Sequence, residues 1–412
     1  MNTFFKTLNV GILTIIIFFS LTSCDDSENK EINQNIETAE LIQRGDAIQL
    51  GKEWDEVQNN FSKFTKAIAA DPHDNQSKIQ LAQLYIREAR VTGEHGHYYP
   101  GALAILDNTL NDPELTDDMK FLAMTTKAGV ELSLHEFADA LKTGNAAALL
   151  NPNNAQIHGV LVDANVELGN YDKAVKLSDK MISIKPDIRS YSRVSYLREI
   201  HGDVKGSIDA MTLAVKAGYP GYEETAWAML TLGDIYKQYG QLDNAMQVYQ
   251  EILQMRPDYP FAVGAIGDVQ ILQGKEKEGE ATLKSAMNII PEVGFYISLA
   301  ELYKKQGRTN EMNALLNEIM VMLKEDTDSG HNMNMEYAGL YLDVYEDIDK
   351  AEEYAQLEYS KRPQNIDVNR LMARVATARE NIAEAKKYLT VAKSTGSVHP
   401  EIKELENLLQ MT

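Results

Sequence analysis

The chain has 412 residues, of which 61 are Asp or Glu and 40 are Lys or Arg, so its formal net charge at pH 7 is −21. This acidity argues against binding of nucleic acid or anionic lipid by the chain as a whole, and it favours basic proteins or peptides, or neutral glycans. The only cysteine is Cys24, which excludes an intramolecular disulfide, a zinc site built from several cysteines and a dithiol redox pair.

Residues 1–23 have the order of a secretory signal peptide. Lys6 precedes an apolar run, LNVGILTIIIFFSL, and small or polar residues follow the run. The run reaches only about two-thirds of the ~20 residues that a membrane-spanning helix needs. The sequence therefore predicts a cleaved signal peptide and not a membrane span.

The stretch LTSC, which ends at Cys24, resembles the lipobox of bacterial lipoproteins, with an apolar Leu21 three residues before the cysteine. The departure is Thr22, which is tolerated. The resemblance implies that Cys24 carries a diacylglyceryl group, becomes the first residue after cleavage and is then N-acylated, with no other cofactor. Two or three acyl chains are enough for stable anchoring. The alternative is an inert cysteine after an ordinary signal or a short anchor.

Residues 24–39 are predicted to be a disordered tether, because DDSENKEINQNIET is rich in charge and has almost no apolar residues. Fourteen flexible residues span ~20 Å, enough to hold a folded body off a membrane. Acidic residues directly after the cysteine resemble the surface-export signal of Bacteroidetes lipoproteins, whereas Asp25 in enterobacteria would mean inner-membrane retention. The expected location is a bacterial envelope membrane, in first place the outer membrane, facing the periplasm or the surface.

Prolines repeat with a period of 34 residues, at Pro152, Pro186 and Pro220 and again at Pro257 and Pro291. Within the unit at 227–257 the apolar residues follow the i, i+3/i+4 spacing of two short helices. Small residues allow the paired helices to approach closely, a glycine falls at the turn between them, and proline ends the second helix. Each such unit leaves an apolar face that only its neighbours can cover, so the units must stack.

The pattern Leu232, Gly233, Tyr236, Gly240, Ala245, Tyr249 and Pro257 resembles the tetratricopeptide repeat (TPR). Weaker copies extend the pattern over residues 40–396, at about ten units. The resemblance implies an all-α, right-handed superhelical solenoid, and residues 397–412 are predicted to form a C-terminal capping helix. We find no sustained alternation of apolar and polar residues that would indicate strands.

In TPR proteins, fixed positions of the first helix of each unit face a concave groove. The resemblance carries these positions onto Trp227, Leu230, Asp234, Lys237, Phe261, Asp268, Glu301 and Lys304. Aromatic and charged residues in this mixture suit an extended peptide or a partner helix. The competing interpretation, equally weighted, is that Trp227 and Phe261 only pack against neighbouring helices.

Residues 92–101, TGEHGHYYPG, break the period and are predicted to form an insertion loop. His95 and His97, with Glu94, would ligate a divalent metal in such a loop, although a plain exposed loop is the better interpretation. Tyr98 and Tyr99 would alternatively contact a partner. The remaining histidines singled out here, His135, His158, His201 and His331, are scattered one to a unit and are expected on helix surfaces.

No phosphate-binding loop, nucleophile elbow, HExxH or cysteine zinc set occurs in the sequence. The leading hypothesis is therefore a membrane-anchored, non-catalytic TPR lipoprotein that acts as a scaffold or adaptor for other envelope proteins or peptides. A glycan- or solute-binding surface lipoprotein is the second hypothesis. A metal-binding envelope protein that uses residues 92–101 is the third.

Overall fold

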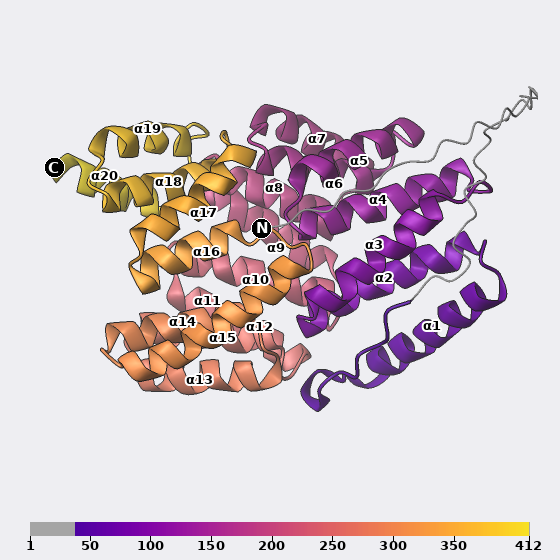
Figure 1. Cartoon of the computed structure of the whole chain (residues 1–412), viewed down its shortest axis with the longest axis horizontal. Coiled ribbons are helices and arrows are strands. Elements are labelled where there is room, and N and C mark those ends of the chain that lie inside the picture. Colours follow the sequence, from indigo (N-terminus) through magenta and orange to yellow (C-terminus); the bar gives the residue numbers. More distant parts are fainter. Residues whose placement is uncertain (1–37, 412) are drawn as a thin grey trace, which may run out of the picture.

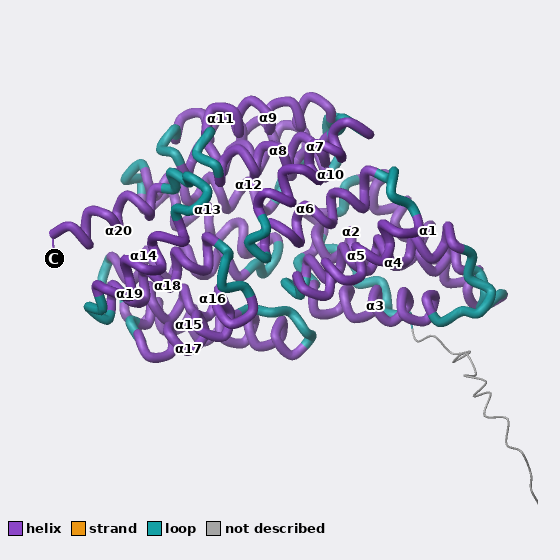
Figure 2. Tube along the Cα trace, turned by 90° about the horizontal axis from the view of Figure 1, so that it is seen from above, coloured by secondary structure: helices purple, strands orange, loops and turns teal. Residues whose placement is uncertain are grey.

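The structure is a computed structural model that describes residues 38–411. These residues form twenty α-helices and no strand, which confirms the all-α fold (Figures 1 and 2). The helices of the N-terminal half are α1 (Gly51–Ala70), α2 (Asn75–Thr92), α3 (His95–Leu110), α4 (Asp117–Ser133), α5 (Phe137–Leu150), α6 (Ala155–Glu167), α7 (Tyr171–Ile184), α8 (Ile188–Ile200), α9 (Val204–Ala217) and α10 (Glu223–Gln238). Those of the C-terminal half are α11 (Leu242–Met255), α12 (Pro260–Leu272), α13 (Glu276–Ile289), α14 (Val293–Lys305), α15 (Thr309–Asp328), α16 (Asn334–Leu340), α17 (Ile348–Lys361), α18 (Ile366–Ala378), α19 (Ile382–Ala392) and α20 (Pro400–Met411).

Consecutive helices pair into antiparallel hairpins, from α2 with α3 to α18 with α19. The described residues contain nine such hairpins, close to the ten units expected, with α1 before them and α20 after them. The last helix buries Ile402, Leu405 and Leu409 and lies against α18 and α19, so it covers the end of the stack. Two short elements, η1 (Asp46–Ile48) and the π-helical η2 (Tyr341–Tyr345), interrupt the array.

The hairpin of α10 and α11 shows why the repeat pattern folds as it does. A Cβ atom at Gly233 would lie 2.2 Å from the ring of Tyr249, so only glycine permits this approach of the two helices. Gly240 has φ +75° and makes the turn between them. Ala245 and Tyr249 are both completely buried. As the sequence predicted, the small residues allow close packing of the two helices, and the glycine forms the turn between them.

The expectation of an insertion loop at residues 92–101 is wrong. Gly93, with φ +77°, ends α2, and α3 begins at His95 and continues through Pro100. Tyr98 and Tyr99 are the reason, because both side chains are buried and Tyr98 packs against Tyr85 with ring centroids 5.7 Å apart. Burial of two aromatic side chains offsets the backbone hydrogen bond that proline cannot donate.

The stack winds far enough for its C-terminal half to lie on its N-terminal half. Figure 1 shows α15 to α17, in orange, beside the purple and magenta helices of the N-terminal half, and α15 contacts α3. Most of the hydrogen bonds between the halves join residues 195 to 203 positions apart, from Tyr171 with Ile366 to Glu53 with Arg256. This separation is close to six units of 34 residues, so about six hairpins complete one superhelical turn. We call this line of contacts the seam.

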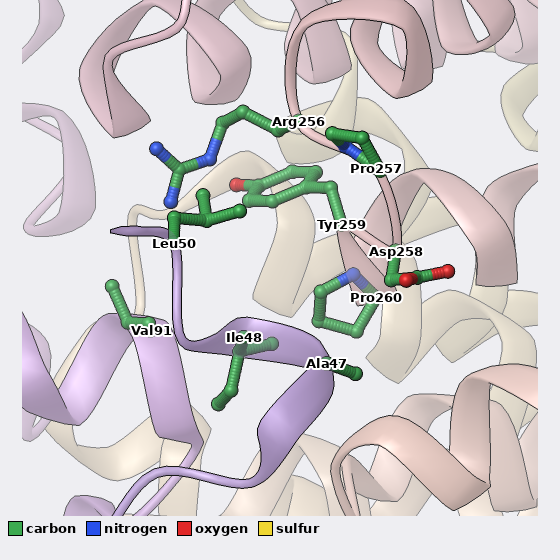
Figure 3. Close-up of a pocket in the computed structure, with 9 residues that line it drawn as sticks. All are labelled: Ala47, Ile48, Leu50, Val91, Arg256, Pro257, Asp258, Tyr259 and Pro260. Atoms are coloured by element: carbon green, nitrogen blue, oxygen red, sulfur yellow. The ribbon is translucent and has the colours of Figure 1, made fainter. Parts of the chain in front are cut away.

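The N-terminal end of the seam joins the segment before α1 to the connection between α11 and α12. Figure 3 shows Ala47, Ile48 and Leu50 facing Tyr259 and Pro260 across a small pocket. The Arg256 guanidinium, almost completely buried, donates to Glu53 at 2.9 Å and to the carbonyl oxygen of Gly221 at 2.9 Å.

Further along the seam, turns inside the hairpins of the first half meet connections between the hairpins of the second half. The backbone amide of Asn332 donates to the carbonyl oxygen of Leu134 at 3.0 Å. The Ile366 amide, at the start of α18, donates to the Tyr171 hydroxyl at 2.8 Å. Arg362 pairs with Glu167 across the same line. The superhelix is therefore held by specific bonds between turns as well as by packing between neighbouring hairpins.

Two turn glycines permit this close approach. Gly202 has φ +81°, and a Cβ atom there would lie 2.6 Å from the carbonyl oxygen of Gly396. At Gly169, with φ +77°, a Cβ atom would lie 2.6 Å from the backbone of Gln364. Gly240 has almost the same backbone angle but open space around it.

We expect Gly202→Ala to destabilise the protein more than Gly240→Ala. Both changes put a side chain into the left-handed region at a cost of about 1–2 kcal/mol. Only Gly202→Ala also forces the two turns apart, which adds about 1–3 kcal/mol. Chemical denaturation of the two variants measures the difference, and equal losses of unfolding free energy would show that the seam contributes nothing at this point.

Candidate functional site

The predicted groove residues all lie on the first helices of three consecutive hairpins, α10, α12 and α14. We call the surface that these helices and their equivalents α8 and α18 present the inner face. Lys237 joins two of these helices, because its Nζ lies 3.4 Å from Asp234 Oδ1 and 3.4 Å from Asp268 Oδ2. Burial opposes the charge on Lys237, but the two carboxylates outweigh it and raise its pKa. Tyr249 donates its hydroxyl hydrogen to Asp234 at 2.7 Å and ties this network to the core.

The network continues from α14 toward the C-terminus. Lys304 donates to the carbonyl oxygen of Asp343 at 2.6 Å and pairs with Glu346 at 2.8 Å. The Asp343 carboxylate in turn pairs with Arg374 of α18. Charged side chains thus link successive first helices along the inner face.

The same surface extends to α8 and α18, which belong to different turns. Gln238 donates to Glu199 at 2.7 Å, and the Tyr196 hydroxyl lies 3.4 Å from an Asp367 carboxylate oxygen. Arg370 of α18 pairs with Glu401 at 2.7 Å. The sequence interpretation missed these residues because it transferred the groove positions only to the three best-matching units. The same register applied to the weaker units at 188–200 and 366–378 would have pointed to them.

Acidic groups dominate the electrostatics of the inner face. Burial raises the pKa of Asp268, although Lys237 opposes the rise. Burial also raises the pKa of Glu199 and of Glu301, and the Asp343 and Asp268 carboxylates add to the effect on Glu301. Burial leaves these carboxylates poorly solvated, so a cationic group of a ligand would stabilise their ionised form.

The two aromatic residues of the predicted groove have different roles. Phe261 is half-buried between Tyr259 and Phe295, with ring centroids 5.5 Å and 6.3 Å away, so it packs. Trp227 is 47% exposed. Leu230 is half-buried against the core around Tyr249. Of the apolar groove residues, Trp227 is therefore the one that offers a large open surface.

Two further exposed aromatic residues lie just before α10 and escaped the sequence interpretation. Tyr219 is 76% exposed and Tyr222 is 68% exposed, with ring centroids 6.1 Å apart. Exposed tyrosines of this kind are enriched at binding surfaces because they offer large apolar area with a polar tip. In the sequence, Pro220 served only as a marker of the 34-residue period, and the tyrosines on either side of it were not considered.

The residues expected in the insertion loop are dispersed. His97 lies 2.8 Å from the carbonyl oxygen of Glu40 and does not share a ligand set with His95. Tyr98 is completely buried and cannot contact a partner. Its hydroxyl oxygen accepts a hydrogen bond from the Ile42 backbone amide at 3.0 Å. Tyr99 is buried and stacks on His95 with centroids 5.4 Å apart. The loop contact through Tyr98 and Tyr99 is therefore ruled out by their burial.

The scattered histidines do not all lie on helix surfaces. His158 and His331 are buried, and His331 lies edge-on to His135 with ring centroids 4.6 Å apart. The seam brings together histidines from units that are far apart in the sequence. No spacing rule along the chain could have shown this, because the contact depends on the superhelical pitch.

The predicted signal peptide, Cys24 and most of the tether lie outside the described residues. Among residues 38–411, no helix combines the length and the apolar character needed to span a bilayer.

Residues 228–259 match the tetratricopeptide repeat family. The chain thus contains a TPR unit, and the hairpin array around it is a TPR-like solenoid. Over 178 residues, 43% of this chain, it is 21% identical to the human protein O-mannosyl-transferase TMTC1, and it spans one-fifth of that protein's length.

Solved structures that are similar to this chain include three proteins whose sequence identity to it is low. The APC/C hetero-tetramer Cut9-Hcn1 is 13% identical, with 88% of this chain and 61% of that chain covered and a TM-score of 0.46. The pilF protein of Pseudomonas aeruginosa is 14% identical, with 61% and 96% covered and a TM-score of 0.33. The MamA protein is 18% identical, with 42% and 92% covered and a TM-score of 0.32.

The raised pKa of Glu301 predicts a pH-dependent effect of Glu301→Gln. The folded protein holds this proton more tightly than the unfolded chain, so ionised Glu301 costs stability at pH 7 to 8 and costs none below its usual pKa near 4.5. We expect Glu301→Gln to raise the unfolding free energy at pH 8 and to have no effect at pH 4. The gain should be less than about 1 kcal/mol, because the side chain packs near other acidic groups but is still partly open to water, which screens its charge.

Glu280→Gln is the opposite control. Arg308 lowers the pKa of Glu280 to about 2, so the ionised group stabilises the fold at neutral pH. We expect this variant to lose stability at pH 7, with the loss shrinking as the pH falls toward 2. Denaturation curves at several pH values check both, and a Glu301→Gln gain that persists at pH 4 would contradict the assignment.

Proposed function

We propose that this chain is a membrane-anchored, non-catalytic TPR lipoprotein that binds other envelope proteins or peptides along its inner face. The observation that carries the proposal is the inner face itself, where Trp227 is exposed beside a network of half-buried carboxylates and a few cations. TPR solenoids are binding surfaces in general, and the detected repeat at residues 228–259 contributes α10 to this face.

The ligand that fits best is an extended segment with basic and apolar residues. Carboxylates outnumber cations in the network, as they do in the whole chain, so a basic side chain would gain charge-assisted hydrogen bonds there. An apolar residue of the same segment would pack on Trp227. Acidic partners and nucleic acid are disfavoured by the same charge.

The proposed membrane anchor is a lipid on Cys24. Its place in LTSC, after a short apolar run and before a polar stretch, supports lipidation and a tether to the membrane, in first place the outer membrane.

Crosslinking and affinity purification from the native cells test the proposal, with wild type compared with Trp227→Ala, Leu357→Ala and Cys24→Ala. Leu357 is 49% exposed, like Trp227, but lies on α17, a second helix of its hairpin, and serves as the matched control. We expect one stoichiometric envelope protein that is reduced at least ~10-fold by Trp227→Ala, because an exposed Trp at a binding centre is worth 1.4 kcal/mol or more.

Leu357→Ala should leave the recovery unchanged, and Cys24→Ala should move the protein out of the membrane fraction. Recovery of the same partners at the same yield with Trp227→Ala would contradict the inner-face assignment. Retention of Cys24→Ala in the membrane fraction would contradict the lipid anchor.

The second candidate function is binding of a neutral glycan. Tyr219 and Tyr222 favour it, since two exposed rings 6.1 Å apart offer a platform on which sugar faces stack. Glycan arrays with wild type and a Tyr219→Ala, Tyr222→Ala double variant distinguish it from peptide binding. A glycan that binds wild type and not the double variant would support this alternative.

A further inference from the structure

One cluster of polar side chains on the seam has no part in the inner face. His95 begins α3, Asp326 lies near the end of α15, and His331 lies in the connection between α15 and α16. Potential ligand atoms of the three side chains all lie within 4.8 Å of one another. Two imidazoles and one carboxylate converge there from both halves of the superhelix.

His331 is the observation that points to a ligand. Its side chain is only 9% exposed, and neither ring nitrogen has a hydrogen-bond partner among the described residues. Burial without a partner is costly for a ring with one donor and one acceptor nitrogen, and native proteins rarely leave such groups unsatisfied. Its backbone amide donates to the backbone carbonyl oxygen of Asp326 at 3.0 Å, which holds the two residues next to each other.

The surrounding side chains hold the cluster in place. Tyr99 stacks on His95 with ring centroids 5.4 Å apart. His135 lies next to His331, and its Nδ1 lies 2.9 Å from the Asn332 carbonyl oxygen, which can only accept, so Nδ1 donates this hydrogen bond. Fixed neighbours of this kind orient the ligands of metal sites.

Charges around the cluster are mainly negative. The carboxylates of Glu325 and Glu336 both lie close enough to repel the charge of Asp326, and one buried oxygen of Glu336 also finds no hydrogen-bond partner in the part of the chain that the structure describes. Arg90 is the cation that acts on His95.

We propose that His95, Asp326 and His331 bind a divalent transition-metal ion, which joins the two turns of the superhelix. Two imidazole nitrogens and one carboxylate oxygen are a ligand set that suits Zn²⁺ and chemically similar divalent ions, with the remaining positions open to water. The site lies on the seam, so its occupancy would strengthen the contact between α3 and the end of α15. The proposal of a metal site does not depend on the protein partner proposed above.

A feature of the sequence makes this site possible. The repeat pattern places proline near position 324, but the chain has Lys324 there, and α15 continues to Asp328. The additional helical turn carries Asp326 toward α3, and the connection that follows places His331 beside it.

Zinc and cobalt titrations of the full chain test the proposal. All proteins carry Cys24→Ser, so that its thiol supplies no ligand. We expect one equivalent of Zn²⁺ to bind and raise the thermal midpoint, and Co²⁺ to give a visible d–d absorption band. Binding should weaken more than ~100-fold in His331→Leu, because a direct ligand matters more than the outer partners that change affinity 10–100-fold.

His331→Leu also separates a metal role from a structural one. Without metal, its thermal midpoint should equal or exceed that of the parent protein, because the change removes an unsatisfied buried ring. Asp326→Asn, which keeps the side-chain shape, should likewise lose the metal response. His97→Ala, which leaves the proposed ligands in place, should keep it.

Absence of Zn²⁺ binding to the parent protein at millimolar metal would overturn the proposal. So would unchanged affinity in both His331→Leu and Asp326→Asn, or a loss of affinity in His97→Ala as large as in His331→Leu.

Discussion

The contact of one superhelical turn with the next is the constraint on which the rest of the structure depends. A solenoid held only by neighbouring hairpins is free to change its pitch, because each unit touches only the units beside it. Here, hydrogen bonds link residues 195 to 203 positions apart, and glycines at positions 169 and 202 leave space for the approaching backbone. The pitch is therefore fixed by specific atoms.

A fixed pitch has consequences for both candidate sites. On the inner face, it brings Tyr196 of α8 to Asp367 of α18, so that charged side chains from different turns share one surface. On the seam, it brings His95 to His331, whose buried ring nitrogens have no hydrogen-bond partner within residues 38–411. Binding on the inner face and metal binding at the seam would thus both act on the same arrangement of turns.

Much of the fold could be predicted from the sequence, because it rests on local rules. The close approach at Gly233, the turn at Gly240 and the capping helix after residue 396 follow from residue size, backbone freedom and amphipathic spacing. The segment at 92–101 could not be predicted in this way. Its glycines and proline suggested a loop, but burial of Tyr98 and Tyr99 decided for a helix. The cluster of His95, Asp326 and His331 depends on superhelical pitch, which no local pattern of residues encodes.

The backbone amide of Asn332 offers the most direct test of the contact between the two superhelical turns. This residue lies in the connection between α15 and α16, outside any helix, and its amide donates across the seam to the carbonyl oxygen of Leu134 at 3.0 Å. Hydrogen exchange of this amide in the native protein separates the possibilities. Protection comparable to that of amides within α10 is the predicted result. Exchange at the rate of a free surface loop would contradict the account.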